Sequence, residues 1–373
     1  MTASLYIHVP FCTKKCDYCH FYVIPDQERF QRFYLEALKK EWELRGPLLP
    51  NLASLYFGGG TPSLLGPDKI ATILSWIPSL PEEITLEANP EEITYEKMVA
   101  FKEAGISRVS IGVQSLNDPL LLKLGRTHTA AQALFAVEET FRAGMENISI
   151  DLMYDLPDQN LGEWEETLKG TLALPISHLS LYNLSIEPHT SFYKKRHLLA
   201  PTLPDEETSL HMLQMAVAAL KDHGFRRYEI SAFERGDYES RHNIGYWTGR
   251  PFLGLGPSAC SYWEGSRFRN HSSLNRWAKL LESGEDPSDF RETLSPLESL
   301  KERLAVGLRM LSGVPREADW PLQIQETVYF LEQEGFLQDK KGSLSLTEKG
   351  ILYHDTVAEH IMNFNLDRFP LGK

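Results

Sequence analysis

Short runs rich in β-branched and apolar residues alternate with amphipathic segments through residue 232 of this 373-residue chain. The clearest strand-like runs are 5–9, 54–57, 84–88, 108–113, 148–153 and 178–184, with 227–232 as a seventh candidate. The segments with apolar residues at helical spacing are 29–44, 70–77, 130–142 and 163–172. Strands that alternate with helices pair in parallel through right-handed crossovers. Six or seven such units predict an α/β fold, built as a partial (β/α)6-type barrel rather than a complete eight-unit one.

Residues with distinctive chemistry follow or close these predicted strands. Cys12 follows the first strand, a run of glycines at 58–60 follows the second, and Glu87 closes the third. Gln114 follows the fourth strand, and Asp151 lies near the end of the fifth. Because the carboxyl ends of parallel strands gather at one end of a β/α barrel, we expect these residues to form one site.

Three of the four cysteines, Cys12, Cys16 and Cys19, are crowded together with the spacing C-x3-C-x2-C. Such crowding indicates metal ligation more than a disulfide framework. Three thiolates can hold three irons of a 4Fe-4S cluster and leave the fourth iron open. A zinc site is the alternative, with His20 as its fourth ligand. Cys260 stands alone, and we interpret it as a small buried hydrophobic residue.

With Tyr18 directly before the third cysteine, this motif after a first strand resembles the signature of the radical S-adenosylmethionine superfamily. The resemblance implies that the methionine moiety of S-adenosylmethionine chelates the open iron. It also implies that an electron from the cluster cleaves the sulfonium to a 5'-deoxyadenosyl radical. The glycine run fits such a site, since glycine lets the backbone approach a ligand closely. A tight turn would need glycine too, but a position one strand after the cysteine loop favours ligand binding.

Further stretches resemble one subfamily, the oxygen-independent coproporphyrinogen III oxidases and their close relatives, the HemW-type heme chaperones. The matching stretches are 6–12, 57–62, 87–90, 110–115, 124–126 and 150–153. The resemblance predicts that one set of side chains and glycines surrounds S-adenosylmethionine. These residues are Tyr6, Tyr18, Phe21, Gly59, Gly60, Thr61, Glu87, Gln114, Arg126 and Asp151. Arg126 suits a carboxylate, and Glu87 or Asp151 suits ribose hydroxyls or an amino group.

Three features separate the oxidases from the chaperones. The oxidases carry a further cysteine two residues after the third, where this chain has Phe21, and an extension before the first strand. The chaperones carry a His-Asn-x-x-Tyr-Trp motif, present here from His242 to Trp247. The resemblance implies heme as a ligand, with His242 on the iron and Tyr246 and Trp247 against the porphyrin. A solvent-facing loop histidine beside core aromatic residues is the structural alternative.

The leading hypothesis is therefore a heme chaperone that delivers heme to an acceptor protein and needs an electron donor for its cluster. The alternative is an oxidase that decarboxylates two propionates of coproporphyrinogen III. A third hypothesis is a zinc-stabilised binding protein without a redox role. No apolar run reaches the length of a membrane span, and no signal-peptide pattern precedes the first strand. We expect a cytoplasmic protein, and its net charge of -13 makes nucleic-acid binding improbable.

The sequence divides into three predicted parts. Residues 1–235 would form the barrel, 236–295 a connecting segment that holds the heme motif, and 296–373 a mostly helical, winged-helix-like domain. In the last part we expect helices at 294–311 and 324–334, two short strands around 340–342, and a final helix from 347. Winged helices often bind DNA, but residues 315–373 carry 6 Lys or Arg against 10 Asp or Glu. A packing or partner-contact role fits that charge better.

Overall fold

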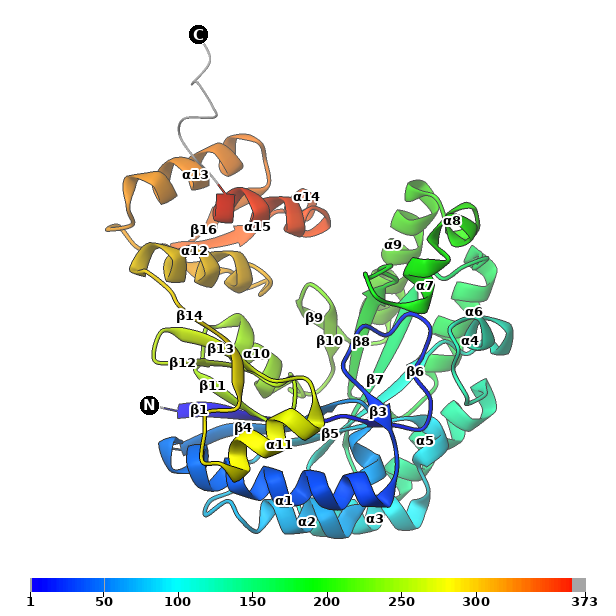
Figure 1. Cartoon of the computed structure of the whole chain (residues 1–373). Coiled ribbons are helices and arrows are strands. Elements are labelled where there is room, and N and C mark those ends of the chain that lie inside the picture. The colour runs from blue at the N-terminus through cyan, green and yellow to red at the C-terminus, as the bar shows by residue number, and fades with distance from the viewer. Residues whose placement is uncertain (1, 50, 364–373) are drawn as a thin grey trace.

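The computed structural model describes residues 2–49 and 51–363 and is organised around one curved sheet (Figure 1). Its six central strands run parallel in sequence order. They are β1 (Thr2–Val9), β4 (Asn51–Gly59), β5 (Ile84–Ala88), β6 (Arg108–Gln114), β7 (Asn147–Tyr154) and β8 (His178–Asn183). The predicted partial β/α barrel is therefore confirmed, and its six clearest strands lie where the sequence pattern predicts them.

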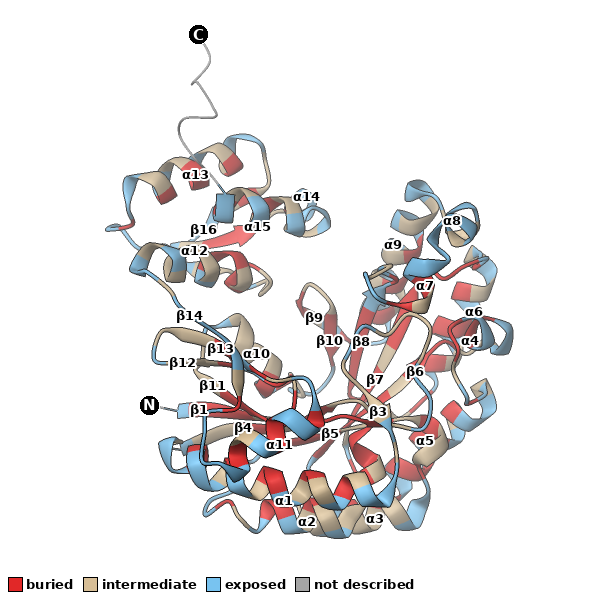
Figure 2. Cartoon of the chain, viewed as in Figure 1, coloured by how far each residue is buried: buried red, intermediate tan, exposed pale blue. Residues whose placement is uncertain are grey.

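The connecting helices cover the convex face of this sheet, as α1, α2 and α3 do in Figure 1. They are α1 (Glu28–Arg45), α2 (Pro67–Leu74), α3 (Tyr95–Ala104), α4 (Asp118–Lys123), α5 (Ala130–Arg142), α6 (Leu161–Leu172) and α9 (Glu206–Asp222). Two short helices, α7 (Ser191–Lys194) and α8 (Arg196–Leu199), precede α9. Burial is concentrated on the sheet and on the inner sides of these helices (Figure 2). The main apolar core lies in this layer.

Alternation along the strands gives the two faces of the sheet different chemistry. On β1 and β4, Leu5, Ile7 and Leu55 are fully or almost fully buried in the apolar core. Tyr6 and Tyr56 lie opposite each other in the ladder and belong to the other face, because successive side chains of a strand point to opposite faces. Polar residues recur on this concave face of each central strand. They include Ser4, Ser54, Thr85, Glu87, Arg108, Ser110, Ser149, Asp151, His178 and Ser180. The barrel interior is therefore a polar surface rather than an apolar core.

Additional strands extend both edges to give a twelve-stranded sheet. Beside β1 lie β11 (Phe252–Leu255), which is parallel to it, and the antiparallel strands β12 (Cys260–Trp263), β13 (Ser266–Asn270) and β14 (Ser288–Thr293). Helices α10 (Arg241–Trp247) and α11 (Leu274–Glu282) belong to the same segment. Residues 236–295 thus add strands to the main sheet.

The prediction of a seventh parallel strand at 227–232 is wrong. This run divides into β9 (Arg226–Glu229) and the start of β10 (Ala232–Glu234), and β10 pairs antiparallel with both β9 and β8. The chain reverses at Ile230 and Ser231. This turn contains no glycine or proline, so the residue pattern of 227–232 predicts one continuous strand.

The C-terminal unit has its own apolar core. It contains α12 (Pro296–Gly307), β15 (Val314–Pro315), α13 (Leu322–Gln333), β16 (Leu337–Lys340), β17 (Ser343–Leu346), α14 (Glu348–Leu352) and α15 (His354–Asn363). The second helix and the strand pair are confirmed, whereas the final helix is broken into α14 and α15. The predicted segment 364–373 lies outside the described residues. Across residues 2–49 and 51–363, no helix has the length and apolarity that crossing a membrane requires.

Candidate functional site

The cysteine motif lies on a loop at the carboxyl end of β1. Two short strands, β2 (Phe11–Cys12) and β3 (Ile24–Pro25), pair in parallel and bracket this loop. The Cys19 amide donates to the Cys16 carbonyl at 3.2 Å, and the Asp17 amide donates to the Leu124 carbonyl at 3.1 Å, which holds the loop against the barrel. All three motif cysteines are partly exposed free thiols. Burial raises the pKa of Cys12 to about 11, so a cationic metal centre would be needed to hold its thiolate form.

The zinc alternative would need His20 as a fourth ligand beside the three thiols. In the described part of the chain, no three His, Cys, Asp or Glu side chains converge on one metal position. A zinc ion takes all of its ligands at one position, whereas in a cubane each thiolate binds a different iron, so the fourth zinc ligand is the residue that distinguishes the two. His20, the proposed fourth zinc ligand, lies instead with its ring 4.5 Å from that of Phe21. Phe21 itself is 52% exposed.

A hydrogen-bonded chain links the cysteine loop to the next three strands. The Cys12 thiol lies 3.5 Å from Thr61 Oγ1, which accepts a hydrogen bond from Asn89 Nδ2 at 2.9 Å. Asn89 Oδ1 accepts from Arg126 at 2.7 Å, and the same guanidinium lies 3.5 Å from the Cys16 sulfur. Arg126 Nε is buried without a partner among the described residues. Arg126 therefore brings a positive charge to the thiols and keeps a free donor, which fits a bound carboxylate.

The glycine run passes close to the residues that follow β1. Gly59 has a φ of 113°, and a Cβ there would lie 2.6 Å from the His8 ring. At Gly60, a Cβ would lie 2.5 Å from the Phe11 carbonyl oxygen. Two hydrogen bonds draw these segments together, from the Gly60 amide to the Val9 carbonyl at 2.8 Å and from the Thr61 amide to the Phe11 carbonyl at 2.7 Å. A side chain at 60 would therefore displace the start of the cysteine loop, and one at 59 would need a left-handed conformation and a shift of the His8 ring.

Two carboxyl groups face the barrel interior below the glycine run. Glu87 accepts hydrogen bonds from the Tyr56 hydroxyl at 2.8 Å and from the Gly59 amide at 3.1 Å. Burial raises the pKa of Glu87 to about 7, and the nearby Asp151 charge adds to this effect. Asp151 accepts from Ser110 Oγ at 3.3 Å, and burial also raises its pKa. The site therefore holds two acids that favour a cationic ligand.

Three further predicted residues lie around this region. The Tyr6 ring stacks on that of Tyr56, with centroids 6.2 Å apart. Tyr18 packs against a small apolar cluster, and burial raises the pKa of its hydroxyl. Gln114 has a φ of 64°, and the ladder between β6 and β7 is irregular just before it. A left-handed conformation at a residue other than glycine is a strain often found at binding sites. Asn89 and Tyr56 were not predicted, although Asn89 lies within the matched stretch 87–90.

The histidine of the predicted heme motif is buried at the base of the barrel interior. His242 is 1% exposed, with Nδ1 2.9 Å from Ser54 Oγ and Nε2 2.9 Å from the Tyr246 hydroxyl. Burial lowers its pKa to about 3. The alternative in which His242 is a solvent-facing loop residue is wrong, because α10 packs against β4. Both ring nitrogens are occupied in this conformation, while Tyr246 and Trp247 line a pocket outside the barrel.

Known proteins match this chain along nearly its whole length. The pattern of the radical SAM superfamily matches residues 6–169. The heme chaperone HemW of Bacillus subtilis is 32% identical over 95% of this chain and 97% of its own length. The chain belongs to the HemW family of radical SAM proteins. A mitochondrial radical S-adenosyl methionine domain-containing protein 1 of Bos taurus is 36% identical over 95% of this chain and 82% of its own.

Among solved structures, coproporphyrinogen III oxidase (HemN) of Escherichia coli has a TM-score of 0.84. It covers 97% of this chain and 90% of its own chain at 23% identity. At that identity the likeness establishes a shared fold. This chain and the oxidase therefore share their overall fold.

Membership of the radical SAM superfamily implies a 4Fe-4S cluster and S-adenosylmethionine, and the described residues fit both. The three free thiols suit the cluster, and Arg126 lies beside one of them with an unpaired donor. Gly60 packs against the Phe11 backbone at the start of the cysteine loop, so the end of the glycine run lies beside that loop. When bound, the pair would supply one-electron chemistry. The protein's own residues would orient the ligand and balance its charge.

The pKa of Glu87 leads to a pH prediction for the ligand. Since this pKa lies near 7 rather than at the ordinary 4.5, the fold favours the protonated acid, and stability falls as the pH rises from 4.5 through about 7. Binding of the cationic S-adenosylmethionine should do the opposite and tighten, by about tenfold, as the pH rises through that range. Glu87→Gln should bind more weakly and lose this pH dependence in equilibrium dialysis, while Glu91→Gln, a carboxyl with a pKa of about 2, should keep it. A wild-type affinity that does not change with pH would contradict the prediction.

Proposed function

We propose that this chain is a heme chaperone, which binds heme together with a 4Fe-4S cluster and delivers the heme to an acceptor protein. The observation that carries the proposal is the 32% identity to the heme chaperone HemW of Bacillus subtilis over 97% of that protein. A second heme chaperone HemW, of Lactococcus lactis, is also 32% identical, over 97% of its length. Identity over the full length includes the C-terminal unit as well as the barrel.

In this proposal Cys12, Cys16 and Cys19 hold the cluster. The S-adenosylmethionine site is the set of predicted residues at the strand ends, with Asn89 added. The aromatic faces of Tyr246 and Trp247 meet the porphyrin. His242 is a heme ligand only in a state in which its hydrogen bonds to Ser54 and Tyr246 are broken.

The partners of this function are an acceptor protein for heme and an electron donor for the cluster. We place the protein in the cytoplasm, where free thiols persist, as all four cysteines are unpaired here. The acidic net charge of -13 supports a protein that does not bind nucleic acid.

One pair of assays tests the proposal against oxidase activity. The anaerobically reconstituted protein is incubated with coproporphyrinogen III, S-adenosylmethionine and a reductant, and in parallel is titrated with heme. We expect tight, stoichiometric heme binding and no protoporphyrinogen above the background. Catalytic formation of protoporphyrinogen would overturn the chaperone proposal and make Phe21 a tolerated replacement for the extra cysteine of the oxidases. The matched control is the Cys12→Ala, Cys16→Ala, Cys19→Ala variant, which separates cluster-dependent turnover from chemical oxidation.

A further inference from the structure

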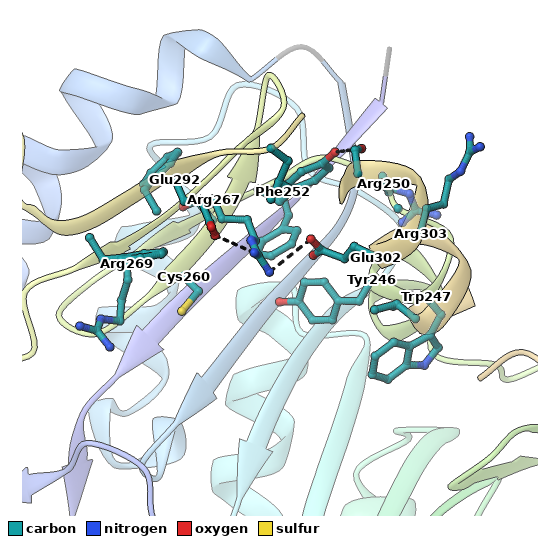
Figure 3. A pocket seen from close by; sticks show the side chains of 18 residues that line it. Tyr246, Trp247, Arg250, Phe252, Cys260, Arg267, Arg269, Glu292, Glu302 and Arg303 are labelled. Atoms are coloured by element: carbon teal, nitrogen blue, oxygen red, sulfur yellow. Dashed lines mark hydrogen bonds and ion pairs between the residues drawn. The ribbon is translucent and has the colours of Figure 1, made fainter. Parts of the chain in front are cut away.

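A pocket of about 420 Å³ lies outside the barrel, between α10, strands β12–β14 and α12. The residues around it come from both the sheet edge and the C-terminal unit, as Figure 3 shows for Tyr246, Cys260, Arg267 and Glu302. Its volume lies within the range of small-molecule and cofactor sites. None of the predicted cluster or S-adenosylmethionine residues lines it.

Aromatic rings form much of its wall. Tyr246 and Phe252 meet edge to face with centroids 4.6 Å apart, and Trp247 follows on the same helix. Two more rings come from the antiparallel strands, and Phe290 is 47% exposed. These two are Tyr262 and Phe290, which lie on the same face of the strands as Cys260. A wall of this kind suits a flat, largely apolar ligand.

The same lining is basic, although the chain as a whole is strongly acidic. It contains four arginines against two glutamates, a net charge of +2 on a chain of net charge -13. One arginine, Arg267, pairs with both glutamates, Glu292 at 2.6 Å and Glu302 at 3.2 Å (Figure 3). The remaining three arginines therefore have no carboxylate partner within the lining. An anionic ligand would complement this charge.

Arg250 is the best placed of the three. Arg269 and Arg303 pair with Asp289 and Glu317, which lie outside the lining. Arg250 makes no ion pair with a described residue, and its Nη1 donates only to Ser4 Oγ at 3.3 Å and to a backbone carbonyl at 3.0 Å. A guanidinium has five N–H donors, so Arg250 retains donors for a carboxylate.

The pocket also contains a free thiol. Cys260 is exposed, and its thiol has no hydrogen-bond partner among the described residues. It lies on the same face of β12 as Tyr262, two residues on, because side chains alternate along a strand. The prediction that Cys260 is a buried hydrophobic residue is therefore wrong. A thiolate is an established axial ligand of heme iron, and its proton would pass to solvent when iron binds.

We propose that this pocket is the porphyrin site, that Cys260 ligates the heme iron, and that Arg250 binds a propionate. The inference rests on the proposed function and specifies where its ligand lies. The pocket combines three properties that suit heme: aromatic side chains in its lining, more arginines than carboxylates, and a soft donor. Tyr246 and Trp247 both line this pocket, whereas His242 does not, and the hydrogen bond between His242 Nε2 and the Tyr246 hydroxyl holds Tyr246 in place.

The test titrates hemin into the full-length, cluster-loaded protein and follows affinity and the absorption spectrum, including the ferrous–CO form that identifies thiolate ligation. Cys260→Ser should lose the thiolate signature and bind about tenfold more weakly. Arg250→Gln should bind hemin about tenfold more weakly than wild type does. It should bind hemin dimethyl ester, which lacks free carboxylates, with the wild-type affinity. Arg276→Gln, on the exposed side of α11, is the matched control for charge and should bind as wild type does. Unchanged iron and sulfide content in each variant confirms folding.

Three results would overturn the pocket assignment. One is a Cys260→Ser protein with the wild-type spectrum and affinity. Another is an Arg250→Gln protein whose affinities for hemin and for hemin dimethyl ester fall by the same factor. The third is a thiolate-free wild-type spectrum that changes only in His242→Gln, which would assign the iron to the imidazole. In all three the chaperone function stands, because the wild type binds heme. A wild-type protein that binds no hemin would overturn the proposed function itself.

Discussion

Replacing Cys12, Cys16 or Cys19 singly with Ala should abolish cluster assembly, so that the iron and sulfide bound after anaerobic reconstitution fall to background. Each thiolate holds a different iron, so two remaining cysteines leave two irons without a protein ligand. No other cysteine can replace the lost one, since Cys260 lies on β12 in the separate pocket. The measurements are iron and acid-labile sulfide analysis together with the visible absorption of the cluster.

Cys260→Ala is the matched control for this experiment and should assemble a full cluster. It removes a thiol of the same chain without touching the loop between β2 and β3. A wild-type protein with stoichiometric zinc and no sulfide would contradict the cluster. So would a Cys16→Ala protein that retains both iron and sulfide.

The strands and helices of the partial barrel could be predicted because the sequence signals for them are local. Each central strand is a short apolar run bounded by polar residues. The observed bounds of β5 (Ile84–Ala88) are those that its pattern predicts. Capping boxes at Thr129 and Asn160 likewise set the starts of α5 and α6. In a β/α barrel, strand order and crossover handedness then bring Cys12, Glu87 and the other strand-end residues to one end.

The parts that sequence patterns miss depend on contacts between distant segments. His242 carries the motif of the family, yet its environment is set by Ser54 on β4, 188 positions away. Asn89 joins Thr61 to Arg126 across three strands, and no local pattern marks such a bridge. The pocket is formed by the edge strands of the main sheet together with α12. Side-chain alternation therefore places Cys260 on the pocket wall only once β12 is known to pair with β11 and β13.

Gly60→Ala should remove S-adenosylmethionine binding, with a loss of at least about tenfold in affinity, and should destabilise the fold by about 1–3 kcal/mol. The new Cβ would stand 2.5 Å from the Phe11 carbonyl oxygen and 3.0 Å from the Phe11 carbonyl carbon and amide nitrogen. All three are backbone atoms and cannot rotate away, so the end of β4 must separate from the start of the cysteine loop. That movement breaks the hydrogen bond from the Thr61 amide to Phe11, and it shifts Thr61 away from the Cys12 thiol.

Gly162→Ala is the matched control because it makes the same change on the exposed side of α6. Gly162 lies in the first turn of α6, where a Cβ would lie 3.3 Å from the side-chain oxygen of Asn160, which can shift slightly. This variant should therefore stay within about 1 kcal/mol of wild type in stability and should bind S-adenosylmethionine normally. Urea denaturation and equilibrium dialysis of both variants give the comparison. If Gly60→Ala kept wild-type affinity, the close approach of β4 to the cysteine loop would be a folding requirement alone. If it lost affinity but kept its iron and sulfide, the glycine run would be part of the ligand site itself.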